Sequence, residues 1–427
     1  MIEIDHRPVC NGVNFRSIKD TKFKTVRISV NFMLPIQKST AAPNALLPFL
    51  LSRASREYPD YTKLAERLAE LYGAQINADV QKFGDVQLLS ISASGIADRY
   101  ALNGERISAE LSRLLCSVIF DPPFENELFP KDGFEQEKRQ TIELIESEYN
   151  DKRTYAKQRC EEIMCADEPF GINRYGSKEA IENLEREELT KTWQHLIHHS
   201  QIEIMALGDC EPSLVFEGFQ NAFCKLDRTS VVDCSTKNVL KAERVHDVEE
   251  KMEVAQSKLV LGFRTAVAIP SPEVEAVKLM TALFGGTPSS KLFLNVREKL
   301  SLCYYCSAQY FTMKGIMLVQ SGVETKNVEK AKKEILAQLD EIKNGNFDDD
   351  EINAAKLSIC NSYRSVSDSL GGLESWYLSQ IFAAQIKSPE EAAAMIHAVS
   401  RQEIIDAANR VTLDTVYRLL GKEEETA

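Results

Sequence analysis

The chain has 427 residues, more than one ordinary hydrophobic core covers, so the length predicts two or three domains. Hydrophobic residues make up 44% and charged residues 27%, which is the balance of a globular protein. The formal net charge of -13 argues against nucleic acid or an anionic membrane as a partner. No apolar run approaches the length of a membrane span.

The first residues, MIEIDHRPVCNGV, contain no apolar segment that would direct export, so we expect a cytoplasmic protein with reduced thiols. Among the ten cysteines, Cys303 and Cys306 form a C-x-x-C pair. A redox pair needs its first cysteine at a helix N-terminus, whereas this pair lies in a strand pattern. Because no second C-x-x-C is present, the spacing does not favour zinc there either.

Periodicity predicts the elements of the first half in order. Residues 23–35 alternate as a strand, with Val26, Ile28, Val30 and Phe32 on one face. An apolar helix follows at 45–55, with Pro48 near its start, and an amphipathic helix at 61–72. Strands 74–80 and 86–93 form a hairpin. The remaining predictions are helices 101–118, 133–150, 153–165, 178–184 and 187–199, strand 202–207 and helix 212–226.

Residues 227–250 are polar and poorly patterned, which predicts a linker between domains. Beyond it the pattern begins again with strand 257–264 and helix 272–284. The second half continues with a helix and strand over 289–306, strand 316–321, helices 326–343, 348–366, 370–385, 389–397 and 402–410, and strand 416–420.

The stretch from Phe284 to Tyr305 is a candidate functional segment because of its residue types. Residues 285–288, Gly-Gly-Thr-Pro, predict a turn, and Ser289 or Ser290 can cap the helix that follows. Arg297 falls in the last helical turn and Tyr304 early in the next strand. A cation and a phenol on one wall are what a developing oxyanion requires. The alternative is a solvated arginine and a core tyrosine.

The two halves are repeats of one plan. Lys63-Leu64 corresponds to Lys291-Leu292, and the Gln-x-Phe of residues 81–83 to that of residues 309–311. Ser94-Gly95 corresponds to Ser321-Gly322. We therefore predict an α+β fold of two homologous domains, 1–232 and 246–427, each a mainly antiparallel sheet covered by helices.

This order of elements resembles the pitrilysin/insulinase family of zinc peptidases, which includes the processing peptidases. The resemblance covers nearly the whole chain and is strongest at residues 285–305, with Gly-Gly, Ser-Ser-x-Leu-Phe, Val-Arg-Glu-Lys and Tyr. It implies a metallopeptidase-like fold in which Arg297 and Tyr304 contact substrate.

The same resemblance implies a His-x-x-Glu-His motif on the first helix, with two zinc ligands and a general base. Here Pro48 and Ser52 stand in place of the histidines and Leu51 in place of the glutamate. The third ligand position falls on Leu144, or on Glu143 with a shift of one residue. Glu137 matches a supporting carboxylate, although Glu137 and Glu143 also read as solvated helix charges. We expect no metal in this chain.

Three hypotheses follow. The chain is a catalytically silent subunit of a heterodimeric peptidase, whose partner carries an intact His-x-x-Glu-His with its zinc and whose substrate is a peptide or an unfolded protein. Alternatively, it is a scaffold that binds peptide or protein without cleavage; some silent bacterial members are associated with modification of elongation factor P. The third hypothesis is a metalloenzyme that uses His195 and His199, which lie at i and i+4 on one predicted helix.

Overall fold

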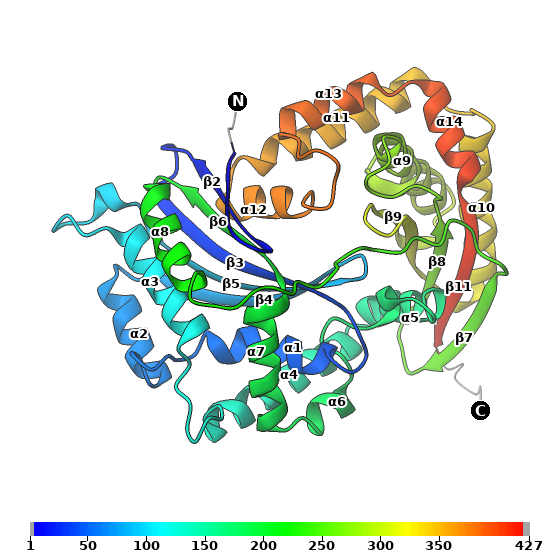
Figure 1. The fold of residues 1–427 in the computed structure, drawn as a ribbon. Helices are drawn as coiled ribbons and strands as arrows, with labels where there is room; N and C mark the ends of the chain where they lie inside the picture. The colour runs from blue at the N-terminus through cyan, green and yellow to red at the C-terminus, as the bar shows by residue number, and fades with distance from the viewer. Residues whose placement is uncertain (1–3, 422–427) are drawn as a thin grey trace. The chain divides into compact units, whose positions relative to one another are not determined.

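The computed structural model describes residues 4–421, which form two compact units (Figure 1). Residues 1–3 and 422–427, at the outer ends of the two predicted domains, lie outside the described residues. In the first half the elements are β1 (Asp5–Cys10), β2 (Val13–Lys19), β3 (Thr25–Pro35), α1 (Ala41–Leu51), α2 (Tyr61–Glu70), β4 (Gln75–Phe83), β5 (Val86–Ile96), η1 (Asp98–Tyr100), α3 (Ile107–Phe120), α4 (Lys131–Asn150), α5 (Lys152–Met164), η2 (Pro169–Gly171), α6 (Lys178–Glu182), α7 (Arg186–His199), β6 (Gln201–Gly208) and α8 (Pro212–Phe223).

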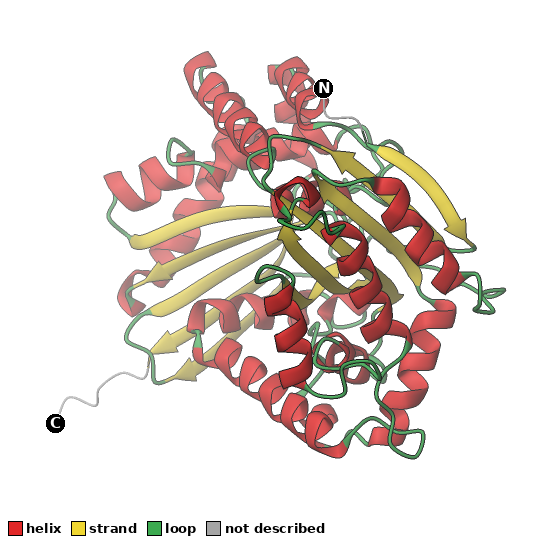
Figure 2. Cartoon of the chain, turned by 90° about the vertical axis from the view of Figure 1, so that its left-hand side faces the viewer, coloured by secondary structure: helices red, strands yellow, loops and turns green. Residues whose placement is uncertain are grey.

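In the second half they are β7 (His246–Met252), β8 (Ser257–Arg264), α9 (Val274–Thr281), η3 (Ala282–Gly286), η4 (Leu292–Lys299), β9 (Cys303–Phe311), β10 (Ile316–Val323), η5 (Thr325–Asn327), α10 (Val328–Lys343), α11 (Asp349–Val366), α12 (Leu370–Leu378), α13 (Pro389–Ala398), α14 (Arg401–Arg410) and β11 (Thr412–Gly421). Figure 2 shows how helices cover the strands.

The first sheet has the strand order β1-β2-β6-β3-β5-β4 within residues 4–421. β2 and β6 are parallel and the other neighbours antiparallel. The predicted inward face of β3 is confirmed, because Val26, Ile28, Val30 and Phe32 are all fully buried in one hydrophobic core. Residues of α1, α3, α7 and α8 complete that core, and α1 and α7 lie together beneath the sheet in Figure 1.

The second sheet repeats this plan with the order β7-β11-β8-β10-β9 in the described chain. Its β7 and β11 are parallel, as β2 and β6 are, and its remaining neighbours are antiparallel. The predicted α+β duplication is therefore confirmed. The predicted linker at 227–250 extends too far, since His246–Met252 forms β7. This strand lies at the sheet edge, and its mostly polar residues conceal a pairing made by backbone groups.

The repeat motifs agree with the register only in part. Gln81 pairs with Leu88 and Gln309 with Leu318, at equivalent places near the two hairpin turns. Ser94, however, pairs with Gln75 at the far end of its hairpin, whereas Ser321 lies nearer its turn. The Ser-Gly correspondence is therefore wrong in register, because two small residues match easily by chance.

Each compact unit contains a segment from the other half of the sequence. Ser147–Gly171, with α5, belongs to the second unit, and Ser369–Leu378, with α12, belongs to the first. The predicted boundaries 1–232 and 246–427 follow the duplication rather than this exchange. α12 lies against β3 and β6, on the side of the first sheet opposite α1 and α7 (Figure 1).

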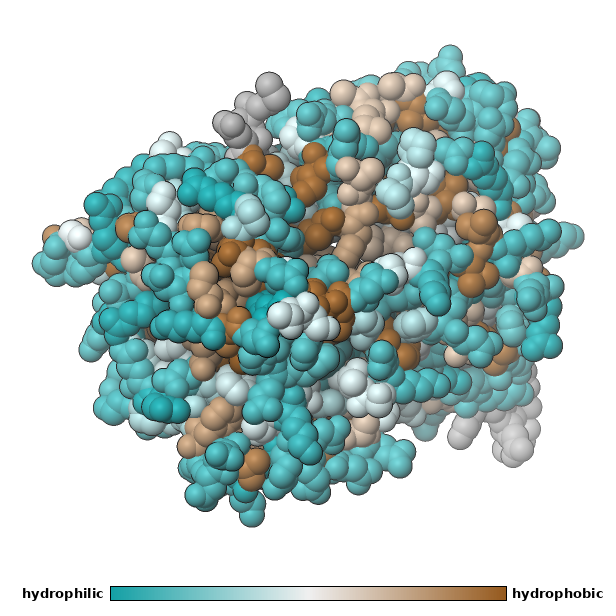
Figure 3. All heavy atoms as spheres, in the orientation of Figure 1, coloured by the Kyte–Doolittle hydropathy of each residue, from teal (hydrophilic) through white to brown (hydrophobic). Residues whose placement is uncertain are grey.

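Some predicted elements differ from the observed ones. β1 and β2 were not anticipated, since their short, polar-interrupted alternation gives a weak strand signal. α1 begins at Ala41 and not at residue 45, so Pro48 lies inside the helix rather than near its start. Within residues 4–421, no helix is long and apolar enough to cross a membrane. Most of the face drawn in Figure 3 is hydrophilic.

Buried ions attach α5 and the residues that follow it to the second sheet. Arg264 donates from Nε to Asp414 at 2.8 Å and from Nη2 to Glu168 at 2.7 Å. Lys314, which is fully buried, pairs with the other Glu168 oxygen at 2.9 Å. Burial alone would raise the pKa of Glu168, but hydrogen bonds from Arg264 and Lys314 outweigh it and lower the pKa below the ordinary value of 4.5.

We expect Glu168→Gln to destabilise the attachment of Ser147–Gly171 by about 3 kcal/mol at neutral pH, because it leaves two buried cations short of a counter-charge. Hydrogen exchange of the α5 amides would then accelerate by about a hundredfold. Since the folded pKa is the lower one, the wild-type advantage is present above pH 4.5 and is lost as the pH falls through the folded value. Glu162→Gln, on the exposed side of α5, is the matched control. Equal exchange rates in the two variants would contradict the prediction.

Candidate functional site

The predicted zinc-motif positions lie at the end of α1, a helix of small and aliphatic residues. Pro48 and Leu51 are buried, and neither side chain has a donor atom for a metal. Ser52 caps the helix C-terminus, and its hydroxyl donates to the Phe49 carbonyl at 2.9 Å. Leu144 is 40% exposed on α4. The structure therefore places four positions without a metal-binding group where the family resemblance implies zinc ligands and a base.

The carboxylate that remains near the motif, that of Glu137, is paired with a guanidinium. Arg53, the residue after the motif, forms an ion pair with Glu137 on α4 and donates to Gln136 at 2.8 Å. The Glu137 side chain is 6% exposed, so the alternative reading of Glu137 as a solvated helix charge is wrong, whereas Glu143 is exposed. These residues do not fit a zinc ion, because the retained carboxylate already has a fixed cation.

A cavity of about 780 Å³ opens beside this ion pair. β4 forms one wall, and it is an edge strand of the first sheet in the described residues. Its lining mixes apolar groups with amides and one ion pair: Phe49, Ser52, Arg53, Tyr61, Leu64, Ala65, Leu68, Ala74, Gln75, Ile76, Asn77, Ala78, Gln136, Glu137 and Gln140. A second cavity of about 440 Å³ shares Arg53, Tyr61 and Gln136 with the first. The three shared side chains thus lie between the two cavities.

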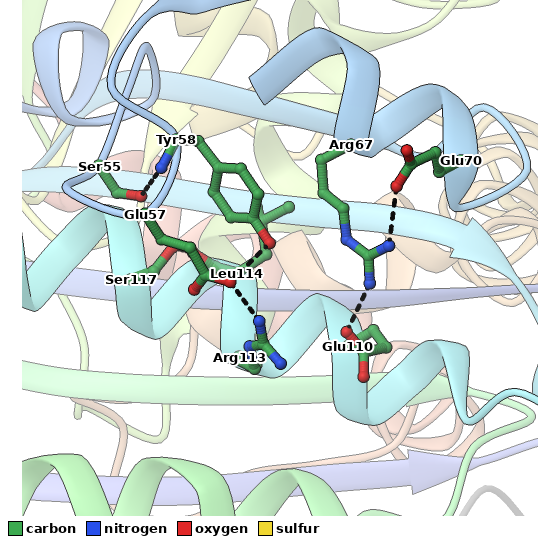
Figure 4. Close-up of polar contacts among 9 residues, drawn as sticks. All are labelled: Ser55, Glu57, Tyr58, Arg67, Glu70, Glu110, Arg113, Leu114 and Ser117. Carbon is green, nitrogen blue, oxygen red and sulfur yellow. Dashed lines mark hydrogen bonds and ion pairs between the residues drawn. The ribbon is translucent and has the colours of Figure 1, made fainter. Parts of the chain in front are cut away.

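Ion pairs with α3 hold α2 and the residues before it, and so the α2 wall of the larger cavity, in place (Figure 4). Arg67 of α2 donates to Glu70 at 3.1 Å and to Glu110 of α3 at 2.7 Å. Before α2, Glu57 pairs with Arg113 of α3. Because α3 packs in the core of the first unit, the cavity has one wall anchored to a rigid element.

The Arg297–Tyr304 block lies in the second unit. The helix predicted there is π-helical, as η4, and Leu292 and Val296 are its buried residues. Gly285 and Gly286 end a second π-helix, η3, so the predicted turn is wrong at these two positions. A Cβ on Gly285 would lie 2.7 Å from Leu292 and 2.8 Å from the backbone nitrogen of Ala308. Close approach to β9, rather than a turn, requires this glycine.

Both candidate side chains of the block reach solvent. The Arg297 side chain is 40% exposed, lies over the Phe293 ring at 4.5 Å and contacts Glu298 at 3.5 Å. Tyr304 is 68% exposed. The alternative reading of Tyr304 as a core residue is therefore wrong. A side chain that binds another molecule must be exposed, and both of these side chains are. Their catalytic role stays a prediction.

The histidines of α7 have local partners. His199 and His198 each share a hydrogen bond between Nδ1 and a loop carbonyl, at 2.8 Å with Ser230 and 2.6 Å with Asp227. Burial, and then the charge of His199, lowers the pKa of His195. In residues 4–421, no group of three or more His, Cys, Asp or Glu side chains gathers in a way that could hold a metal. Within that part of the chain, His195 and His199 therefore lack the further protein ligand that a zinc site needs.

Comparison with known proteins matches residues 183–359 to the family described as "Peptidase M16 inactive domain". A Bacillus subtilis protein described as "Probable inactive metalloprotease YmfF" is 32% identical over 96% of both chains. Among solved structures, a conserved protein from Enterococcus faecalis has a TM-score of 0.90 at 31% identity over 99% of both chains. A Pseudomonas fluorescens "peptidase M16 inactive domain" has a TM-score of 0.79 at 15% identity over the full length of both, which shows the shared fold.

The fold and the degenerate motif together define a zinc-peptidase scaffold without a working metal centre. The chain belongs to the M16 peptidase family, as an inactive member that is not catalytic alone. The resemblance deduced from the sequence is therefore confirmed. Arg53 was missed because a basic residue after a helix end has no periodic signature, and only its contact with Glu137 gives it meaning.

We expect Arg53→Ala to destabilise the first unit by about 2 kcal/mol, since Glu137 would remain buried without its cation. Both tryptophans of the chain, Trp193 and Trp376, belong to this unit, so their fluorescence in a urea titration reports its unfolding. Arg56→Ala removes an exposed ion pair nearby and is expected to change stability by less than about 0.5 kcal/mol. Equal unfolding midpoints for the two variants would show that the Arg53–Glu137 pair does not stabilise the first unit.

Proposed function

We propose that this chain is the non-catalytic subunit of a two-chain zinc peptidase. Its partner is a related chain with an intact His-x-x-Glu-His motif, and its contribution to the partner's site is Arg297 and Tyr304. The observation that carries the proposal is the contrast between the two halves. The motif positions of the first unit hold no metal-binding group, while the arginine and tyrosine of the second unit stay exposed.

The chemistry of the two side chains suits this role. Peptide hydrolysis by a zinc-bound water develops negative charge on the scissile carbonyl oxygen. Tyr304 donates a hydrogen bond to that oxyanion, and Arg297 holds a neighbouring substrate carbonyl. A single donor of this kind is worth about 3–4 kcal/mol of the barrier. The substrate is a peptide or an unfolded protein, because only an extended chain offers its carbonyls in this way.

In the reconstituted pair, we expect Tyr304→Phe and Arg297→Ala each to lower kcat/KM for a peptide by about a hundredfold, because each removes a donor to the transition state. Quenched-fluorescence peptide cleavage measures this. Tyr100→Phe and Lys299→Ala, at exposed positions, are the matched controls. Wild-type turnover in both site variants would overturn the role of the block, whatever the controls do.

A specific observation supports a second candidate function, peptide binding without cleavage. The 780 Å³ cavity lies on β4, which is an edge strand of the first sheet within residues 4–421. An extended peptide can add to such an edge and place a side chain in the cavity. A link to elongation factor P modification would belong to this function and stays a prediction.

For this second function we expect Ala65→Trp to weaken peptide binding at least tenfold, because an indole on α2 would fill the cavity. Ala69→Trp is the matched control, since Ala69 is exposed on the same helix and does not line the cavity. Fluorescence anisotropy with a labelled unstructured peptide measures both variants. Equal affinities would exclude the cavity as the peptide site. Capture of a His-x-x-Glu-His homologue by the tagged chain would favour the first function over the second.

A further inference from the structure

Two thiols lie close together at the start of β9, beside the Arg–Tyr block. Cys303 and Cys306 belong to one strand, and in a regular strand residues three apart point to opposite faces. A regular strand would therefore keep the two thiols apart, in addition to the missing helix N-terminus that argues against a redox pair. The structure departs from the rule at this place.

A β-bulge puts both cysteines on one face of the second sheet. In the pairing of β9 with β10, Cys306 lies opposite Ser321, Tyr305 opposite Gly322 and Cys303 opposite Val323, so that Tyr304 is an extra residue. Cys303 and Cys306 are accordingly buried in the same hydrophobic core. The equivalent strand of the first unit, β4, pairs with β5 residue for residue from Gln75 to Phe83. The bulge therefore distinguishes the second copy of the duplicated hairpin.

The register also sets the separation of the two cysteines. Their partners, Ser321 and Val323, are two residues apart on β10. Two residues of antiparallel strand span about 6.7 Å, which is near the upper end of the Cα separations found in disulfides. The two thiols lie close enough for each to shift the pKa of the other. Closing the bond requires only a local adjustment of the bulge.

The surroundings make the two thiols unequal. The hydrogen bond with Cys306, opposed by burial and aided by Ser321 and the charge of Arg297, lowers the pKa of Cys303 to about 7. The same hydrogen bond, together with burial, raises the pKa of Cys306 well above its ordinary value. Burial raises the pKa of other described thiols, including Cys116 and Cys210. Cys303, which is 8% exposed near the sheet edge, is thus the favoured nucleophile.

We propose that Cys303 and Cys306 are a redox-active dithiol that closes into a reversible disulfide across the Tyr304 bulge. The oxidant is a low-molecular-weight disulfide. The Cys303 thiolate attacks one of its sulfurs, forms a mixed disulfide and releases one thiolate, which takes the proton of Cys306. The Cys306 thiolate then attacks the Cys303 sulfur and releases the second thiolate, which takes from water the proton that Cys303 had lost to it. One external disulfide is reduced to two thiols, and one disulfide forms in the protein.

The disulfide would constrain the backbone that presents Tyr304 and would remove the thiolate beside Arg297. It therefore regulates the Arg–Tyr block, and this consequence rests on the proposed function of the block. Formation of the bond itself does not depend on that function, so the two can be tested separately.

The test uses the reduced full-length chain and glutathione disulfide, followed by alkylation and mass spectrometry. Trypsin releases both cysteines in one peptide, residues 300–314, between Lys299 and Lys314. We expect this peptide to lose the mass of two hydrogen atoms and both alkylation sites, and to regain them with a reductant. Modification of the exposed Cys224 is the internal control that the oxidant is active.

Two variants separate the roles of the thiols. Cys306→Ser is expected to stop at a stable glutathione adduct on Cys303, and Cys303→Ser to leave Cys306 alkylatable and free of glutathione. The proposal is overturned if the wild-type peptide keeps both alkylation sites while Cys224 is modified. It is equally overturned if the wild type stops at an adduct on Cys303, or if Cys306 reacts as fast in Cys303→Ser as Cys303 does in Cys306→Ser.

The effect on the block is measured afterwards in the reconstituted peptidase. Oxidation with glutathione disulfide is expected to lower kcat/KM at least tenfold in the wild type and to leave the rate of Cys303→Ser, treated in the same way, unchanged. If the disulfide forms but kcat/KM does not change, the redox-active dithiol is supported and its regulation of the Arg–Tyr block is rejected. If Tyr304→Phe is also without effect, the proposed function fails instead.

Discussion

The buried guanidinium of Arg264 is the interaction on which the second unit depends. It binds Asp414 of β11 and Glu168 of the segment after α5, and so joins a strand from the end of the chain to residues from its first half. A matching arrangement exists in the first unit, where Arg27 of β3 pairs with Glu374 of α12. Each sheet thus receives a covering helix from the other half of the sequence. Neither half of the sequence by itself supplies all the elements of its unit.

The exchange shows what can hold the family architecture in a chain whose zinc-motif positions carry no metal-binding group. A structural zinc site would contribute directly to stability, but a catalytic one is an open position that folding does not require. Here the scaffold is held by sheet cores and buried ion pairs. The one carboxylate left near the motif, Glu137, is neutralised by Arg53. An arginine in this place offsets the cost of burying a lone carboxylate, and its side chain lines the neighbouring cavity.

The second hairpin differs from the first through one extra residue. The bulge at Tyr304 directs that side chain outward and places Cys303 and Cys306 on the same face. Above it, two π-helical turns replace regular α-helix, and Gly285 allows η3 to approach β9 closely. Such irregular backbone is uncommon away from functional sites, because it sacrifices regular hydrogen bonding. The exposed arginine and tyrosine lie where these irregularities meet.

The sequence alone determined the family, the α+β duplication and most strands and helices of the core, because these depend on local periodicity and on short motifs. It also determined that Pro48, Leu51, Ser52 and Leu144 cannot bind zinc, since that follows from residue type. Only the tertiary structure decided the exchange of α5 and α12, the pairing of Arg53 with Glu137 and the bulge at Tyr304. These features arise from contacts between residues far apart in the chain, or from a register shift between two strands. Neither of these produces a local pattern in the sequence.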